Sequence, residues 1–168
     1  MCPPAYLYQA PTGVAGDITR TDETNVEPAK LIAASGVYAQ AFGIPMKYAT
    51  GGIQQFNGGA ETPASFAGIL IREVPSISGN SLAGFDTNIP NPDQIAGLAV
   101  RGYVSVLCSS GTPARGGAVY VQIAAQTGRA VGSFHTTDDG ADAILLDNVT
   151  WATDGKDADG NAEIRIAR

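Results

Sequence analysis

Alternation of apolar and polar positions is clearest between Gln94 and Gln126. In the run Leu98–Cys108, apolar side chains and one glycine share one parity, while Arg101 and Tyr103 fall on the other. This period of two predicts a half-buried β-strand. The run Ala118–Ala124 predicts a second strand. The connection between them, 109–117, is too long for a two-residue turn, so we expect either a broad hairpin loop or a crossover to another sheet.

Shorter apolar runs, separated by Gly, Pro, Asn and Asp, predict further strands along the chain. They are Met46–Thr50, Ile53–Phe56, Phe66–Val74, Ala130–His135, Ala143–Leu146, Val149–Ala152 and Ala162–Ala167. The run from Lys30 to Phe42 predicts a strand or a single helical turn, because Gly36 weakens a longer helix. Turn signals spaced about eight to twelve residues apart are typical of an all-β sandwich or barrel.

The 168 residues suit one β-domain preceded by an arm. Residues 1–29 contain several prolines and little apolar sequence, which predicts an extended N-terminal arm before the domain at 30–168. The arm is either a loosely attached terminus or a segment whose Tyr6, Tyr8 and Ile18 dock on a neighbouring subunit.

Residues 76–93 predict a long loop within the domain. Loops of this length are uncommon in compact domains unless they have a function. Phe85 and other apolar residues in it predict that the loop packs on a surface, its own or a partner's.

Composition narrows the possible partners. Only 15% of the residues are charged, and 21 are glycine and 10 proline, which suits a turn-rich protein partly covered by other subunits. The net charge of −6 argues against a nucleic-acid partner, which requires clustered basic residues. No signal peptide and no apolar run long enough to span a membrane are visible, so we expect no membrane partner and synthesis in a cytoplasm.

Candidate catalytic groups are few. His135 is the one histidine and could act as a general base with an aspartate, but no nucleophile motif such as G-x-S-x-G accompanies it. A hydrogen-bonded or exposed histidine at a strand end is the alternative we favour. Cys2 and Cys108 are too few for a disulfide framework or a zinc site.

The acidic segment from Asp154 to Glu163 resembles a calcium loop, but it lacks the bidentate glutamate at the last ligand position. Asp and Gly in this density predict an ordinary turn. The segment 111–117 lacks the spacing of a phosphate-binding loop, so Arg115 is interpreted as a surface or interface charge. We therefore predict no catalytic, cofactor-binding or metal-binding residues and no cofactor.

An ordered series of glycine-punctuated segments resembles the structural cement (head decoration) proteins of tailed bacteriophages. The series is GVAGDI, FAGILI, GLAVRGYVSV followed by GTPARGGAVYV, and DADGNAEIRIA. It runs in order from about Val14 to Ala167, and the segment 76–93 departs from it.

This resemblance implies a jelly-roll-like β-fold on the outer surface of an icosahedral head. It further implies binding to the major capsid protein, stabilisation of contacts between its subunits, and a homodimer or another small homo-oligomer. The candidate partner-binding residues are Tyr6, Tyr8, Ile18, Arg20, Phe85 and Arg115. Two alternatives remain open: another virion β-module, such as a tail or host-attachment protein, and a small β-barrel hydrolase or ligand-binding protein that uses His135.

Overall fold

The computed structural model describes residues 13–72, 90 and 92–167, which form an all-β structure as predicted. Its strands are β1 (Ile18–Lys30), β2 (Pro45–Ala49), β3 (Gly52–Gln55), β4 (Phe66–Leu70), β5 (Ile95–Ser110), β6 (Ala118–Gln122), β7 (Phe134–His135), β8 (Ala143–Trp151) and β9 (Asn161–Ile166). Two short 3₁₀ helices, Pro63–Ser65 and Gly140–Asp142, precede β4 and β8. None of the described segments forms a helix long and apolar enough to cross a membrane.

The strand β5, 16 residues long, holds the whole sheet together. On one side the strand order continues from β5 through β7, β6 and β8 to β9, and β9 pairs back with β5, so these five strands close into a ring. The β5–β7 pairing is parallel and the other pairings in the ring are antiparallel. Closure leaves this part of the sheet without a free edge.

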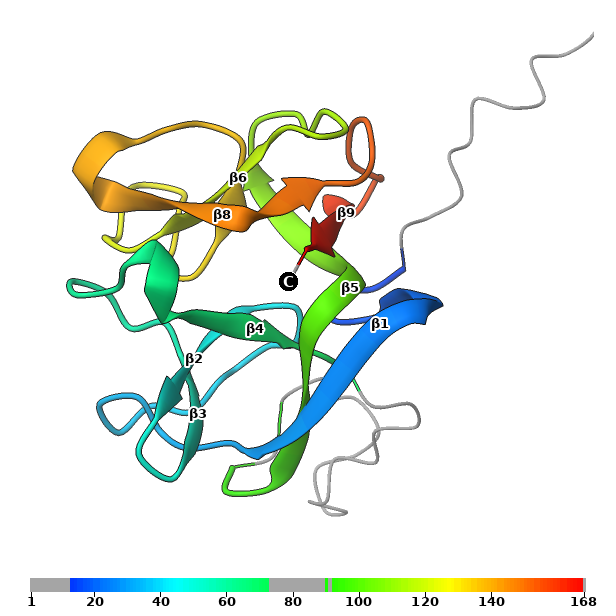
Figure 1. Ribbon diagram of the computed structural model, residues 1–168. Coiled ribbons are helices and arrows are strands. Elements are labelled where there is room, and N and C mark those ends of the chain that lie inside the picture. The colour runs from blue at the N-terminus through cyan, green and yellow to red at the C-terminus, as the bar shows by residue number, and fades with distance from the viewer. Residues whose placement is uncertain (1–12, 73–89, 91, 168) are drawn as a thin grey trace, which may run out of the picture.

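The rest of the sheet is open. The strands β4, β2 and β3 follow one another outward from β5, and β1 pairs with β5 along Ile95–Val104. In Figure 1, β6, β8 and β9 lie at one end of the molecule and β2, β3 and β4 at the other, with β5 running between them and β1 alongside it. The strand β5 is therefore shared by a closed half and an open half.

Each half has its own apolar core. The larger core contains Trp151 and Phe134 and is lined mainly by strands of the ring. The smaller core contains Met46, Ile53 and Leu70 from β2, β3 and β4. The strand β5 contributes buried side chains to both cores.

The strand β5 passes from one core to the other near Gly102. Val100 packs in the smaller core, whereas Val104 packs in the larger one. The sequence predicted one common face for these residues, and the burial pattern agrees, because Val100, Gly102 and Val104 are all buried. Gly102 itself has a φ of 113°, which favours glycine. A Cβ atom at Gly102 would collide with Thr24, so only glycine fits this close approach of β1.

Most of the predicted strands are present with shifted ends, but in the run Ala130–His135 only Phe134–His135 forms a strand, and two connections differ. The connection 109–117 is neither of the two expected ones, a hairpin loop or a crossover to another sheet: β7 lies between β5 and β6, so the connection crosses over one strand within the same hydrogen-bonded sheet. The runs Ala143–Leu146 and Val149–Ala152 form the single strand β8, because Asp147 and Asn148 continue the extended backbone as exposed residues.

The predicted arm and loop are described only in part. Residues 18–30 of the arm region form β1, which pairs with β5 of the same chain. The stretch Lys30–Phe42 contains only isolated bridges after β1 ends, and no helix. Most of the predicted loop 76–93 falls outside the described residues.

Candidate interaction site on the outer face of β1, β5 and β9

Three side chains lie side by side across the outer face of the sheet. Tyr103 of β5 is the register partner of Arg20 on β1 and also of Arg165 on β9. The guanidinium carbon of Arg20 lies 4.0 Å from the centroid of the Tyr103 ring, and that of Arg165 lies 5.9 Å from it. Both distances allow a cation–π interaction. We call Arg20, Tyr103 and Arg165 the arginine–tyrosine row.

Glu163 fixes one end of the row. Its carboxylate accepts hydrogen bonds from Arg20 Nε at 3.2 Å, from Arg20 Nη2 at 2.9 Å and from Thr19 Oγ1 at 2.5 Å. The Glu163 side chain is only 7% exposed, whereas that of Arg20 is 42% exposed. The hydrogen bond with Glu163 raises the pKa of Arg20, so this guanidinium stays charged.

A cleft of about 680 Å³ opens beside the row, between β1, the middle of β5 and the C-terminal end of β9. It exists because β1 bulges: Arg20 pairs with Tyr103 and Asn25 with Arg101, so residues 21–24 lie opposite Gly102 alone. Thr24 Oγ1 closes the bulge by donating to Arg20 O and accepting from Tyr103 N.

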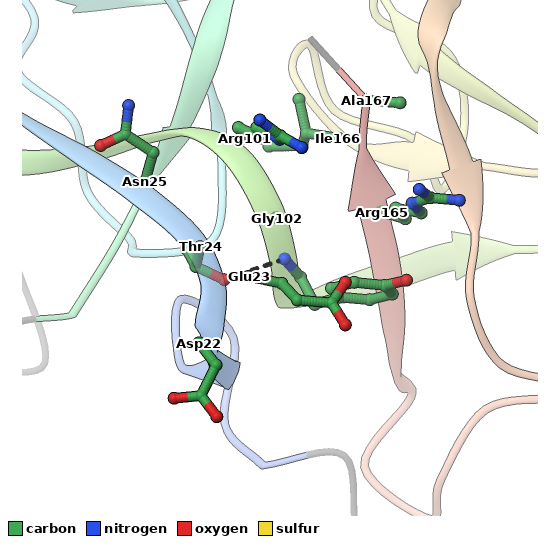
Figure 2. Close-up of a pocket in the computed structure, with 10 residues that line it drawn as sticks. Asp22, Glu23, Thr24, Asn25, Arg101, Gly102, Arg165, Ile166 and Ala167 are labelled. Carbon is green, nitrogen blue, oxygen red and sulfur yellow. Dashed lines mark hydrogen bonds between the residues drawn. The ribbon is translucent and has the colours of Figure 1, made fainter.

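The two walls of this cleft, which we call the β1 cleft, carry opposite charges. Figure 2 shows Asp22 and Glu23 on β1, and Arg101 and Arg165 on β5 and β9. Glu23 extends from β1 toward β9 in this view, whereas Asp22 points away from it. All four side chains belong to exposed residues.

A second, smaller hollow of about 220 Å³ adjoins the first and shares Tyr103 and Arg165 with it. Its lining also includes Arg20 and Arg115, so the structure brings together two of the candidate partner-binding residues. Arg115 lies in the connection between β5 and β6, where its backbone N–H donates to Asp154 Oδ1 at 2.8 Å.

The other candidates lie elsewhere or outside the described residues. Ile18 is half-buried and packs against the larger core of its own chain. Tyr6, Tyr8 and Phe85 fall outside the described residues. For all six candidates, contact with a partner stays a prediction.

The surroundings of His135 do not resemble an open catalytic site. The residue is fully buried in β7, and its ring stacks on Tyr120 with the centroids 6.0 Å apart. Its Nδ1 lies 3.9 Å from a carboxylate oxygen of Asp139, which is itself engaged by Arg129. Burial lowers the pKa of His135, and the charge of Arg129 lowers it further, against a weaker opposing contact with the backbone of Thr137.

The acidic segment before β9 forms a turn, as predicted. Asp157 Oδ1 accepts hydrogen bonds from the backbone N–H groups of Asp159 and Asn161, at 3.0 and 2.7 Å. Among the described residues, no three His, Cys, Asp or Glu side chains are arranged to hold a metal ion.

Sequence reasoning did not select Arg101, Tyr103, Glu163 and Arg165 as site residues. A usable signal was present, because Arg101 and Tyr103 occupy the outward parity of a strong strand. Glu163 and Arg165 alternate in the same way with buried isoleucines in β9. Two strands with charged outward positions indicate a polar face. Only the pairing of β9 with β5 places these four residues together.

Comparison with known proteins agrees with the sequence motifs. The chain matches the structural cement protein family (E217 gp24/Pam3 gp6) over residues 3–167. The chain belongs to this family. A solved chain from "The capsid of Myoviridae Phage XM1" has the same fold, with a TM-score of 0.70 at 18% identity, covering 98% of this chain and 96% of that chain. No curated protein matches the sequence.

Membership in the cement family gives the chain a structural role in a phage capsid and locates it in the virion, in association with the capsid. The family is described as a structural cement protein family.

Proposed function

We propose that this cement-family chain binds the outer surface of an icosahedral phage head and stabilises contacts between subunits of the major capsid protein. The observation that carries the proposal is the family match over residues 3–167. In this proposal the protein acts as a homodimer or another small homo-oligomer. Modest contacts can then suffice, because several contacts per oligomer add through avidity.

The exposure of β1 supports this role. None of its 13 residues is buried, although the strand is hydrogen-bonded to β5 along one side. Within the described residues β5 is the only strand that pairs with β1, so the other edge of β1 is available to a neighbouring subunit. Edge strands of this kind can be extended by a strand from another chain. Charged residues and Pro28 on β1 guard the free protein against non-specific pairing.

The outer face of β1, β5 and β9 supplies a second contact surface. Arginine and tyrosine are enriched at protein interfaces, because a guanidinium and a phenol ring combine apolar area with hydrogen-bonding groups. Within the row, Arg20 is held by Glu163 and lies over the Tyr103 ring, so little of its side-chain entropy remains to be lost on binding.

Binding to heads tests the proposal directly. Purified protein is mixed with undecorated heads and sedimented at a series of salt concentrations, and we expect it to co-sediment with the heads. Absence of binding at every salt concentration would contradict the proposal. Electron microscopy of labelled protein provides the second readout, because labelling of tails rather than heads would favour a tail or host-attachment module.

The predicted arm is tested by truncation. Removal of residues 1–28 would delete most of β1 and disturb its pairing with β5, so the suitable variant lacks residues 1–12 only. We expect this variant to keep its thermal stability and to bind heads more weakly. Unchanged binding would show that the segment with Tyr6 and Tyr8 makes no important contact.

A further inference from the structure

Two arginines of the β1 cleft differ from the other described arginines, because they form no ion pair with a described carboxylate. Arg20 pairs with Glu163, Arg72 with Asp17, Arg115 with Asp154, and Arg129 with Asp139. Arg101 and Arg165 are the arginines without an acidic partner among the described residues, and both line the β1 cleft. The protein as a whole has 16 acidic and 10 basic residues, so unpaired arginines are not explained by a lack of carboxylates.

The two unpaired guanidinium groups lie on the same wall. Arg101 and Arg165 belong to β5 and β9, which pair with each other at Gly102 and Ile166. Thr24 of β1 packs directly against Gly102 at the floor of the cleft, so the two arginines face the space between β1 and β9 rather than the strand beneath. A guanidinium presents N–H donors in a planar fork that matches a carboxylate. This wall is therefore suited to two acidic side chains on a bound segment.

The opposite wall selects against polyphosphates. Asp22 and Glu23 line the β1 side of the cleft and would repel a nucleic-acid backbone, as would the net charge of −6. A polypeptide can avoid this repulsion, because it can present acidic side chains to Arg101 and Arg165 and neutral or basic ones to β1. The volume of about 680 Å³ lies within the usual range of about 300–1,000 Å³ for binding pockets and can hold several side chains.

We propose that the β1 cleft binds an acidic segment of another capsid protein, with Arg101 and Arg165 receiving its carboxylates and Tyr103 packing beneath it. This inference rests on the proposed function, which it makes specific to one surface. It assigns the specificity of attachment to charge complementarity on two walls rather than to the apolar contacts of an arm.

Neutral substitutions measure the contribution of each arginine to binding. Arg101→Gln, Arg165→Gln and the double variant are titrated against undecorated heads by sedimentation. We expect each single change to raise the dissociation constant about fivefold, which corresponds to about 1 kcal/mol for one exposed ion pair, and the double change to raise it further. Added salt should weaken the wild type more than the double variant.

Lys30→Gln is the matched control, because it removes one exposed positive charge from the far end of β1, away from the cleft. It should leave binding unchanged, and thermal melting should show that all variants are folded. If the wild type binds and the double variant binds equally well, the inference is overturned while the proposed function stands. If the wild type does not bind heads at all, the proposed function fails first.

Zero-length cross-linking identifies the occupant of the cleft. Arg101→Lys and Arg165→Lys keep the charge but introduce an amine that a carbodiimide can couple to a carboxylate in contact. Wild-type protein on heads, treated in the same way, is the control. An amide bond from either new lysine to an Asp or Glu of another virion protein supports the inference.

Two results would overturn it. One is coupling only to Asp22 or Glu23, in the same copy or a second copy, which would show that this chain fills its own cleft. The other is binding of a labelled DNA strand that the double Gln variant loses, which would show that the arginines serve a nucleic acid.

Discussion

The two halves of β5 differ in how much of the strand is enclosed by the rest of the sheet. Beyond Gly102, β5 lies in the closed ring and its apolar side chains enter a core of 18 buried residues. Before Gly102, β5 lies in the open half, where the smaller core has eight. The open half also contains the free edge of β1 and borders the β1 cleft.

This difference explains where exposed polar groups gather. In the closed ring every strand has two neighbours, so its backbone has no unpaired edge to offer. At Gly102, β1 leaves its regular register and bulges, and the polar groups of the cleft are exposed there without disturbing the larger core. The closed ring therefore provides a rigid core, and the exposed polar side chains of the β1 cleft lie at the boundary between the two halves.

Trp151→Ala should have the largest effect on stability. Trp151 is 1% exposed in the larger core, and truncation of a buried aromatic side chain costs about 3–5 kcal/mol. Met46→Ala in the smaller core, where the side chain is also fully buried, should cost less, about 2–3 kcal/mol. Urea unfolding of both variants measures the two costs, and the opposite order would contradict the view that the ring is the main scaffold.

Gly102→Ala tests the close approach of β1 to β5 at Gly102. Alanine at a φ of 113° is strained, and its Cβ atom would collide with Thr24, so we expect a loss of about 3 kcal/mol. Gly128→Ala is the matched control, because Gly128 also has a positive φ, 79°, but nothing lies within 4 Å of the added atom. Its cost should be about 1 kcal/mol. Equal losses in the two variants would mean that the contact with Thr24 is unimportant.

The sequence predicted the strands well but not their neighbours. The period-two pattern of Leu98–Cys108 correctly marked a half-buried strand, because burial on one face is a local property. Alternation alone could not show that the buried side chains of β5 enter two different cores, since that depends on which distant strands pack against each part of β5. Neither expected course of the connection 109–117, a hairpin or a crossover to another sheet, is present, because β7, from a later part of the chain, lies between β5 and β6.

The site was predicted only at single positions. Arg20 and Arg115 were recognised as candidate contact residues, and the structure places both around one hollow. Arg165 was not recognised, because its relation to Tyr103 and Arg20 exists only across three strands in register. When paired residues such as Arg20 and Glu163 lie more than 140 positions apart, the local sequence does not show which outward side chains meet.

Glu61→Gln tests a polar network that stabilises the open half. The Glu61 side chain is 1% exposed and lies 2.6 Å from Lys47 Nζ. Its Oε1 also accepts hydrogen bonds from the backbone N–H groups of Asn57 and Gly58, at 3.0 and 3.2 Å. The substitution removes one partner of this nearly buried ion pair and should cost about 2–3 kcal/mol at neutral pH.

The same network predicts a pH dependence. Burial alone would raise the pKa of Glu61, but Lys47 and the backbone donors outweigh it and hold the pKa below its ordinary value of 4.5. The ionised carboxylate therefore stabilises the fold above about pH 4.5, and this contribution is lost as the pH falls toward the lower folded pKa. The stability difference between wild type and Glu61→Gln should shrink between about pH 7 and pH 3 in urea unfolding. A constant difference would contradict this assignment.

Arg20→Lys should have the smallest effect on stability and should separate geometry from charge at the arginine–tyrosine row. Lysine keeps the positive charge but cannot donate two parallel hydrogen bonds to Glu163 or stack its plane on Tyr103. Because the Arg20 side chain is 42% exposed, solvent screening limits the loss to about 1 kcal/mol or less. We expect the free energy of head binding to fall by more than the free energy of unfolding. The reason is that a lysine at this position is not held by two hydrogen bonds and loses conformational freedom on contact. If Arg20→Lys binds as the wild type does, charge alone accounts for the contribution of Arg20, and the fixed geometry of the row has no part in attachment.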